Sequence, residues 1–183
     1  MDTAELKRAS GGLGQKTTAG QITLGAPTPE DGPAVHALIS ACPPLDQNSA
    51  YCNALQCTHF AATCVLARRD GAPVGWVSAY LRPDSPETLF VWQVAVAPEA
   101  RGAGLGLRML DALLAREACR GVRRLETTIT GSNAPSWALF RRLAEGRGAP
   151  MRHRPWLMEG AHLPPSAPTE HLVAIGPFPA TPS

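Results

Sequence analysis

The residues with the clearest chemical meaning form a glycine-rich loop that runs from Arg101 to Gly106. An apolar segment, Leu89 to Ala97, precedes the loop, and leucines at helical spacing follow it. The first amides of a helix have no intrahelical partner, and the helix dipole makes that end positive. Because glycines let the backbone approach a phosphate closely, the loop predicts a site for a pyrophosphate group.

Other interpretations of this loop are available, and two of them are nucleotide-binding patterns. The Lys-Ser/Thr of a P-loop is absent, and no early strand precedes a GxGxxG with an acid about 20 residues further on. The loop could also be a glycine-rich turn that only joins a strand to a helix. Its place between an apolar strand and an amphipathic helix favours the binding function.

A second candidate segment, Thr130 to Asn133, follows an expected strand and opens an expected helix. Asn133 can cap that helix, as Asn commonly does, or it can contact a ligand through its side-chain amide. The two roles can coexist, and the sequence leaves both open.

The elements that must position these loops follow from periodicity and breakers. Alternation around Ile22 and Leu24 predicts a first strand, and Thr28 to Asp31 reads as a helix start with a proline at its first position. Prolines after Cys42 end that helix. The remaining expected elements are a helix over Tyr51 to Phe60, a hairpin of Thr63 to Ala67 with Val74 to Tyr80, a strand over Leu89 to Ala97, a helix carrying Leu105, Met109, Leu110, Leu113 and Leu114, a strand over Arg124 to Ile129, a helix over Ser132 to Ala144, and a closing strand over Leu172 to Ile175.

The 183-residue chain suits one α/β domain, which we expect over residues 21–178. Residues 1–20 predict a disordered arm and residues 179–183 a tail. Apolar residues make up 44%, charged residues 17%, and the net charge is +2, so we expect no nucleic-acid partner. No apolar run approaches the roughly 18 residues of a membrane span, and the first 20 residues hold no signal-like stretch, so we expect no membrane partner and a cytoplasmic protein.

Five cysteines stand without any CxxC pair, which predicts reduced thiols rather than a disulfide framework. Cys52, Cys57 and His59 lie near one another in the chain, but their spacing matches no common zinc pattern. We therefore expect no metal.

Arg101, Gly104 and Gly106 fit the pattern Arg/Gln-x-x-Gly-x-Gly/Ala, and together with Asn133 they resemble the acetyl-CoA site of the GNAT superfamily. The resemblance implies an α/β (α+β) fold with a mostly antiparallel mixed sheet of about six to seven strands, splayed between the fourth and fifth, and about four helices. It also implies a set of acetyl-CoA contacts: the backbone of Val94, Ala95 and Val96, the loop residues Arg101, Gly102, Ala103, Gly104, Leu105 and Gly106, and the side chains of Asn133 and Phe140.

Further stretches are similar to the diaminobutyrate acetyltransferases within that superfamily. They include Pro44-Leu45-Asp46, Asn48-Ser49, Tyr51-Cys52, His59-Phe60, Thr63-Cys64, Val77 to Tyr80, Phe90 to Val96 and Ile175 to Phe178. The resemblance implies transfer of acetyl from acetyl-CoA to the 4-amino group of L-2,4-diaminobutyrate, a step of ectoine biosynthesis, by a homodimer. Another small amine as acceptor, or acyl-CoA binding without catalysis, remains an alternative.

A diamino acid presents two ammonium groups, so acids and aromatic rings should line its site. The resemblance points to five substrate contacts, namely Asp46, Tyr51, Trp92, Gln93 and Glu170, and to Glu126, Trp92 and Asp46 in catalysis, with Glu126 as a base acting through water. Structural alternatives stay open: Asp46 could order a turn, Trp92 could pack in the core, Glu170 could be solvated, and Glu126 could point away.

The chain departs from the family pattern at three places. Phe140 lies where many GNAT enzymes carry a tyrosine acid, and Trp92 or Gln93 lies where some carry a glutamate on the fourth strand. Ala167 stands near the expected position of a histidine, with His162 and His171 as possible substitutes. The proton route is therefore unassigned by sequence.

Overall fold

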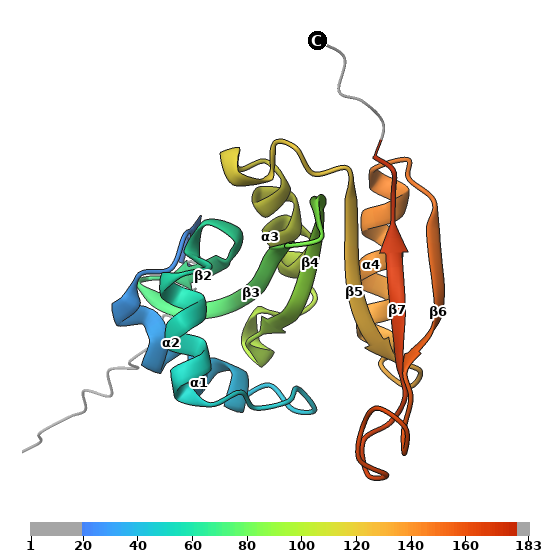
Figure 1. The fold of residues 1–183 in the computed structure, drawn as a ribbon. Helices are drawn as coiled ribbons and strands as arrows, with labels where there is room; N and C mark the ends of the chain where they lie inside the picture. The colour runs from blue at the N-terminus through green and yellow to red at the C-terminus, as the bar shows by residue number, and fades with distance from the viewer. Residues whose placement is uncertain (1–19, 179–183) are drawn as a thin grey trace, which may run out of the picture.

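A computed structural model describes residues 20–178, which form a seven-stranded sheet in the order β1-β2-β3-β4-β5-β7-β6 (Figure 1). The predicted arm and tail lie outside the described residues, apart from Gly20. All neighbouring strands are antiparallel except β4 and β5, which are parallel, so the predicted mixed sheet is confirmed. The strands are β1 Ile22–Gly25, β2 Val65–Arg69, β3 Ala72–Arg82, β4 Ser85–Val96, β5 Arg124–Thr130, β6 Met151–Leu157 and β7 Glu170–Ile175.

Helices cover both faces of the sheet. In Figure 1, α1 and α2 lie in front of β2 and β3, whereas α3 and α4 lie behind the middle and right of the sheet. Each of the four helices overlaps a segment that was predicted to be helical. The helix α1 ends before the prolines that were expected to stop it. Their bounds are α1 Gly32–Ser40, α2 Ala50–Thr58, α3 Leu105–Leu114 and α4 Ala134–Gly146.

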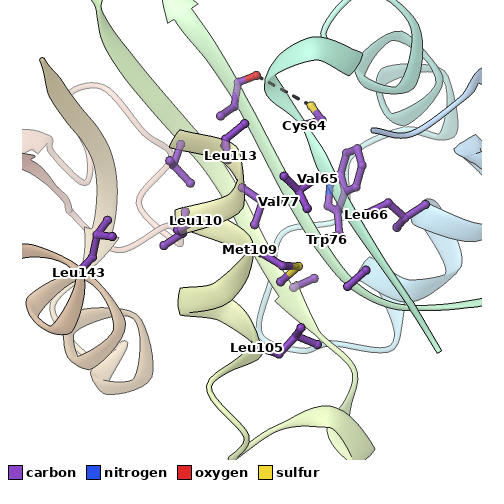
Figure 2. Packing of buried hydrophobic residues seen from close by; sticks show 14 of the residues in the cluster. Cys64, Val65, Leu66, Trp76, Val77, Leu105, Met109, Leu110, Leu113 and Leu143 are labelled. Atoms are coloured by element: carbon purple, nitrogen blue, oxygen red, sulfur yellow. Dashed lines mark hydrogen bonds between the residues drawn. The ribbon is translucent and has the colours of Figure 1, made fainter. Parts of the chain in front are cut away.

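The core lies between the sheet and α3 (Figure 2). The apolar face predicted for α3 is buried at Leu105, Met109, Leu110 and Leu113, each at most 2% exposed. A Cβ at Gly75 of β3 would lie 2.9 Å from the Met109 sulfur, so a larger residue there would require the buried Met109 side chain to shift.

The strands β4 and β5 pair over four residues only, with Thr88 to Val91 opposite Arg124 to Thr127. Beyond that point they diverge (Figure 1). Ser78 and Ala79 of β3 face Gln93 and Val91, so Trp92 is an extra residue in β4. A bulge of this kind bends and twists its strand, which gives a physical cause for the predicted splay.

The sequence analysis missed β6, because Met151–Leu157 lacks apolar alternation and contains Pro155. This strand forms the edge of the sheet, and the five residues from Arg152 to Trp156 are all exposed. Proline is tolerated at an edge, where its missing N–H breaks no ladder hydrogen bond. No helix within the described residues is long and apolar enough to cross a membrane.

Candidate active site

The loop before α3 has the conformation that its glycines predict. Gly102 and Gly104 have φ of 80° and 71°, in the left-handed region that favours glycine, and Gly104 is the N-cap of α3. No side chain caps this helix, and Arg108 is the residue whose amide first bonds back, to the Gly104 carbonyl at 3.1 Å. The first-turn amides before it are therefore available to bind an anion.

Gly106 has a different role from the other two glycines. A Cβ there would already touch both δ-carbons of Leu139 on α4 at 3.4 Å, so a larger side chain would push α3 and α4 apart. Arg101 folds back on β4, where its Nε donates to the Val96 carbonyl at 3.0 Å. The loop and the first turn of α3 thus contact both the end of β4 and the middle of α4.

The backbone of β4 is open where the resemblance expects acetyl-CoA. Ala97 donates its N–H to the Val74 carbonyl of β3 at 3.0 Å, so alternate residues, including Ala95, direct their polar backbone groups toward β3. Val94 and Val96 direct theirs the other way, toward the side from which β5 has diverged. Of the three predicted residues, Val94 and Val96 can therefore offer backbone groups to a ligand, whereas Ala95 faces Trp76 of β3.

The loop between α1 and α2 carries Asp46 and is held by Gln93 of β4. Gln93 donates its Nε2 to the Asp46 carbonyl at 2.7 Å and accepts at Oε1 from Asn48 Nδ2 at 2.8 Å. Its side chain is only 7% exposed. The structure therefore shows Gln93 in contact with the loop, while its predicted substrate contact stays a prediction.

Two predicted aromatic residues are accessible to solvent beside this loop. Tyr51, in the first turn of α2, is 73% exposed, and Trp92 at the β4 bulge is 45% exposed. The exposure of Trp92 argues against the alternative in which it only packs in the core.

Glu170 begins β7, opposite Thr130 of β5. Its Oε2 is buried and has no hydrogen-bond partner within the part of the chain that the structure describes. Burial raises the pKa of Glu170, and the nearby charge of Asp46 raises it further, while Thr128 and His171 act in the opposite direction. The structure therefore brings two predicted carboxylates together from distant segments and disfavours a fully solvated Glu170.

Glu126 lies on the same face of the sheet as Glu170. Glu170 is opposite Thr130 on β5, and Thr130 and Glu126 are an even number of residues apart, so their side chains point to the same face. Its Oε2 accepts from Arg82 Nη1 at 2.7 Å, and Arg82 also binds Asp84 at 2.7 Å. The ion pair lines a hollow of about 260 Å³. Arg82 thus holds one oxygen of the Glu126 carboxylate and stabilises its ionised form.

Asn133 is the N-cap of α4, where its Oδ1 accepts from the Ser136 amide at 3.2 Å. Its Nδ2 has no hydrogen bond within the described residues, so capping leaves a donor for a ligand. The side chain of Phe140 is 3% exposed and belongs to the hydrophobic core. Little of it is therefore accessible for the predicted acetyl-CoA contact.

Neither possible substitute for the missing histidine faces Glu170. His171 pairs with Ile129 and lies near Trp137 of α4, with ring centroids 6.2 Å apart, so it points to the opposite face of β7. His162 accepts at Nδ1 from the Met158 amide within the loop before β7. Among the predicted residues near the C-terminus, Glu170 is therefore the one that lies on this face of the sheet.

The cysteines are poorly suited to carry an acyl group. Burial raises the pKa of Cys57 to about 11 and that of Cys64 to about 12, and it also raises the pKa of Cys52 and Cys119. Among residues 20–178, no three His, Cys, Asp or Glu side chains gather as a metal site would need.

Sequence reasoning missed two residues of this region. Asn48 holds Gln93 from 45 positions away in the chain, and Arg82 holds Glu126 from 44 positions away. Such pairings leave no local spacing signal, because they depend on which strands and loops become neighbours.

Comparisons with known proteins agree with this geometry. The profile of the Acetyltransferase (GNAT) family matches residues 33–144. An L-2,4-diaminobutyric acid acetyltransferase of Methylotuvimicrobium alcaliphilum is 49% identical over 168 residues, which cover 92% of this chain and 98% of that protein. One from Vibrio cholerae is 50% identical over 149 residues, covering 81% and 86%.

Solved structures give the same result. The diaminobutyrate acetyltransferase of Paenibacillus lautus, in complex with its substrate L-2,4-diaminobutyric acid and coenzyme A, is 40% identical with a TM-score of 0.81, covering 90% of this chain and 99% of that chain. The ribosomal-protein-S18-alanine N-acetyltransferase of Escherichia coli, at 18% identity and a TM-score of 0.63 over 88% of this chain and 97% of that chain, shares the fold.

Proposed function

The chain belongs to the L-2,4-diaminobutyric acid acetyltransferases of the acetyltransferase (GNAT) family, and we propose that it transfers acetyl from acetyl-CoA to the 4-amino group of L-2,4-diaminobutyrate. The product is N4-acetyl-L-2,4-diaminobutyrate. We place this reaction in ectoine biosynthesis, as the resemblance of the sequence implies.

One observation carries the proposal: two opposite electrostatic environments meet at one opening in the sheet. The uncapped start of α3 offers amides to the pyrophosphate of acetyl-CoA. Asp46 and Glu170 offer carboxylates near the same opening to a substrate with two ammonium groups. The diverging strands β4 and β5 lie between the two.

The reaction is a direct attack of the neutral amine on the thioester carbon. A backbone N–H of Val94 or Val96 stabilises the oxyanion that forms as the carbonyl is attacked, and coenzyme A leaves as its thiol. No covalent intermediate on the protein is needed, which is consistent with the raised pKa of the buried thiols of Cys57 and Cys64.

We assign acceptance of the amine proton to Glu170 in place of Glu126. A carboxylate with a raised pKa and an unpartnered buried oxygen is a better proton acceptor than an ordinary, solvated carboxylate. The carboxylate of Glu126 is instead engaged by Arg82. In this assignment, Asp46 holds the second ammonium group of the substrate.

We propose a homodimer in the cytoplasm as the working form. The outer edge of β6 ends the sheet, and Trp156 and Met158 beside it are 37% and 45% exposed, which supports a surface for a second copy. All five cysteines are free thiols, as in a reducing compartment. Light scattering should give twice the mass of one chain.

Thiol release from acetyl-CoA tests the function against a panel of L-2,4-diaminobutyrate, ornithine, lysine, spermidine and no acceptor. We expect diaminobutyrate to give the highest kcat/KM by at least about tenfold, since ornithine and lysine add one or two methylenes that misplace the reacting amine, and spermidine lacks the carboxylate. A preference for another amine would replace the substrate assignment. Binding of acetyl-CoA without turnover of any acceptor would contradict catalysis.

A further inference from the structure

The side-chain amide of Gln93 is used at both ends by one loop. Its nitrogen binds the Asp46 carbonyl at 2.7 Å, and its oxygen binds the Asn48 amide at 2.8 Å. Gln93 is 7% exposed, so water competes little for either contact. The two bonds clamp residues 46–48 onto β4.

This clamp stands at a particular place in the strand. Gln93 follows Trp92, the extra residue of the bulge, and precedes Val94, whose backbone groups face the opening between β4 and β5. A shift of the strand at Gln93 therefore moves the loop, and a shift of the loop acts on the strand next to Val94. The loop also reaches β4 at its other end, where Cys42 Sγ donates a long hydrogen bond of 3.4 Å to the Val96 carbonyl. The Cys52 amide donates to Ser49 Oγ within the start of α2, so Gln93 is the contact that holds residues 46–48.

We propose that Gln93 is a positioning residue, which sets the distance between the Asp46 carboxylate and the thioester-binding backbone of β4. This inference rests on the proposed function, because it assumes that Asp46 holds an ammonium group of the substrate. Gln93 acts through the loop and does not touch the substrate. Displacement of a substrate-holding group by about 1 Å can cost on the order of 100-fold in rate, so a clamp of two short hydrogen bonds has a large effect on turnover.

Substitutions in the clamp should change KM for diaminobutyrate but not KM for acetyl-CoA. Gln93→Leu removes both hydrogen bonds, and Asn48→Ala removes one from the other side. For Gln93→Leu we expect KM for diaminobutyrate to rise about tenfold and kcat to fall, with KM for acetyl-CoA within about twofold of the wild-type value. The double variant should lose no more than Gln93→Leu alone, because both substitutions break one connected unit.

A matched control removes a buried hydrogen bond elsewhere in the same half of the sheet. Thr63 donates its hydroxyl to the Ala79 carbonyl at 2.6 Å, and Thr63→Val loses that bond without touching the clamp. We expect Thr63→Val to lower thermal stability and to leave both KM values unchanged. If Gln93→Leu fails to fold, the same kinetic measurements can be made on Asn48→Ala, because Asn48 is only half-buried.

Amide hydrogen exchange over residues 45–49 gives a second measurement that needs no turnover. We expect exchange to be about tenfold faster or more in Gln93→Leu, and unchanged in Thr63→Val. Wild-type KM for diaminobutyrate in a folded Gln93→Leu protein would overturn the positioning role. Absence of diaminobutyrate turnover by the wild type would overturn the proposed function instead, and loop exchange would still decide whether Gln93 holds the loop.

Discussion

At the scale of single residues, Glu170 and Asp46 define the character of the site. They come from β7 and from the loop after α1, and their charges interact although they are 124 positions apart in the chain. Two carboxylates held near each other repel until cations bind between them. A substrate with two ammonium groups would offset this repulsion when it binds.

The pKa of Glu170 leads to a prediction for stability. Because this pKa is raised above the ordinary value of 4.5, the stabilisation from protonated Glu170 is fully present below pH 4.5 and is lost as pH rises through the raised pKa. We expect Glu170→Gln, which stays neutral, to be more stable than the wild type above the raised pKa, by no more than about 0.5 kcal/mol because solvent screens a half-buried carboxylate, and the difference to vanish in acid. Urea unfolding of both proteins across this pH range measures it.

The same substitution should impair turnover, since it removes the group that we propose to accept the amine proton. We expect kcat with diaminobutyrate to fall on the order of 100-fold or more. Equal stability at every pH together with wild-type kinetics would show that Glu170 is an ordinary solvated side chain.

At the scale of elements, the start of α3 links local conformation to binding of acetyl-CoA. Gly104 has a positive φ, and a Cβ there would meet nothing within 4 Å, so glycine serves the backbone conformation and not the available space. We expect Gly104→Ala to lower stability by about 1 kcal/mol through strain in the left-handed region. It should raise KM for acetyl-CoA about tenfold, by tilting the amides that face the phosphates.

Gly146, the last residue of α4, provides the control for this prediction. A Cβ there also meets nothing within 4 Å, and its φ is not positive, so Gly146→Ala should be neutral or stabilising and should not change KM for acetyl-CoA. Thermal unfolding and initial rates on both variants decide the matter. If both variants have a similar KM for acetyl-CoA, the conformation of Gly104 is not needed for phosphate binding.

Elements with a local signal were predictable, and those defined by their neighbours were not. The periodic leucines of α3 and the apolar run of β4 can be recognised from a few neighbouring residues. Burial of one face of an element makes apolar residues recur at a regular spacing. The strand β6 escaped prediction because an exposed edge strand needs no such repeat. Asp46 and Glu170 were found by resemblance, whereas the contacts of Gln93 with Asn48 and of Glu126 with Arg82 required the fold.

At the scale of the whole molecule, the sheet consists of two parts joined along a short seam. The strands β1 to β4 form one part, β5 to β7 form the other, and only Thr88 to Val91 of β4 pair with β5. In the proposed site, acetyl-CoA and diaminobutyrate both bind where the parts diverge, and the residues proposed to hold them come from both sides. Ligands should therefore stabilise the molecule as a whole and not only one loop.

Thermal unfolding with each ligand tests this coupling. A ligand present at 100 times its Kd should add about 2.7 kcal/mol to the free energy of unfolding, which raises the Tm of a domain of this size by several degrees. We expect a shift with coenzyme A alone and a larger shift with coenzyme A and diaminobutyrate together. If diaminobutyrate shifts Tm equally with and without coenzyme A, the two sites do not share the opening.

The most direct test of the central claim is the position of the acetyl group in the product. The protein should be incubated with ¹³C-acetyl-CoA and L-2,4-diaminobutyrate, and the product examined by NMR for a coupling from the labelled carbonyl. We predict a single amide at the 4-nitrogen, formed in equal amount to the coenzyme A released. Acetylation at the 2-nitrogen, or release of coenzyme A without an amide, would contradict the proposed reaction.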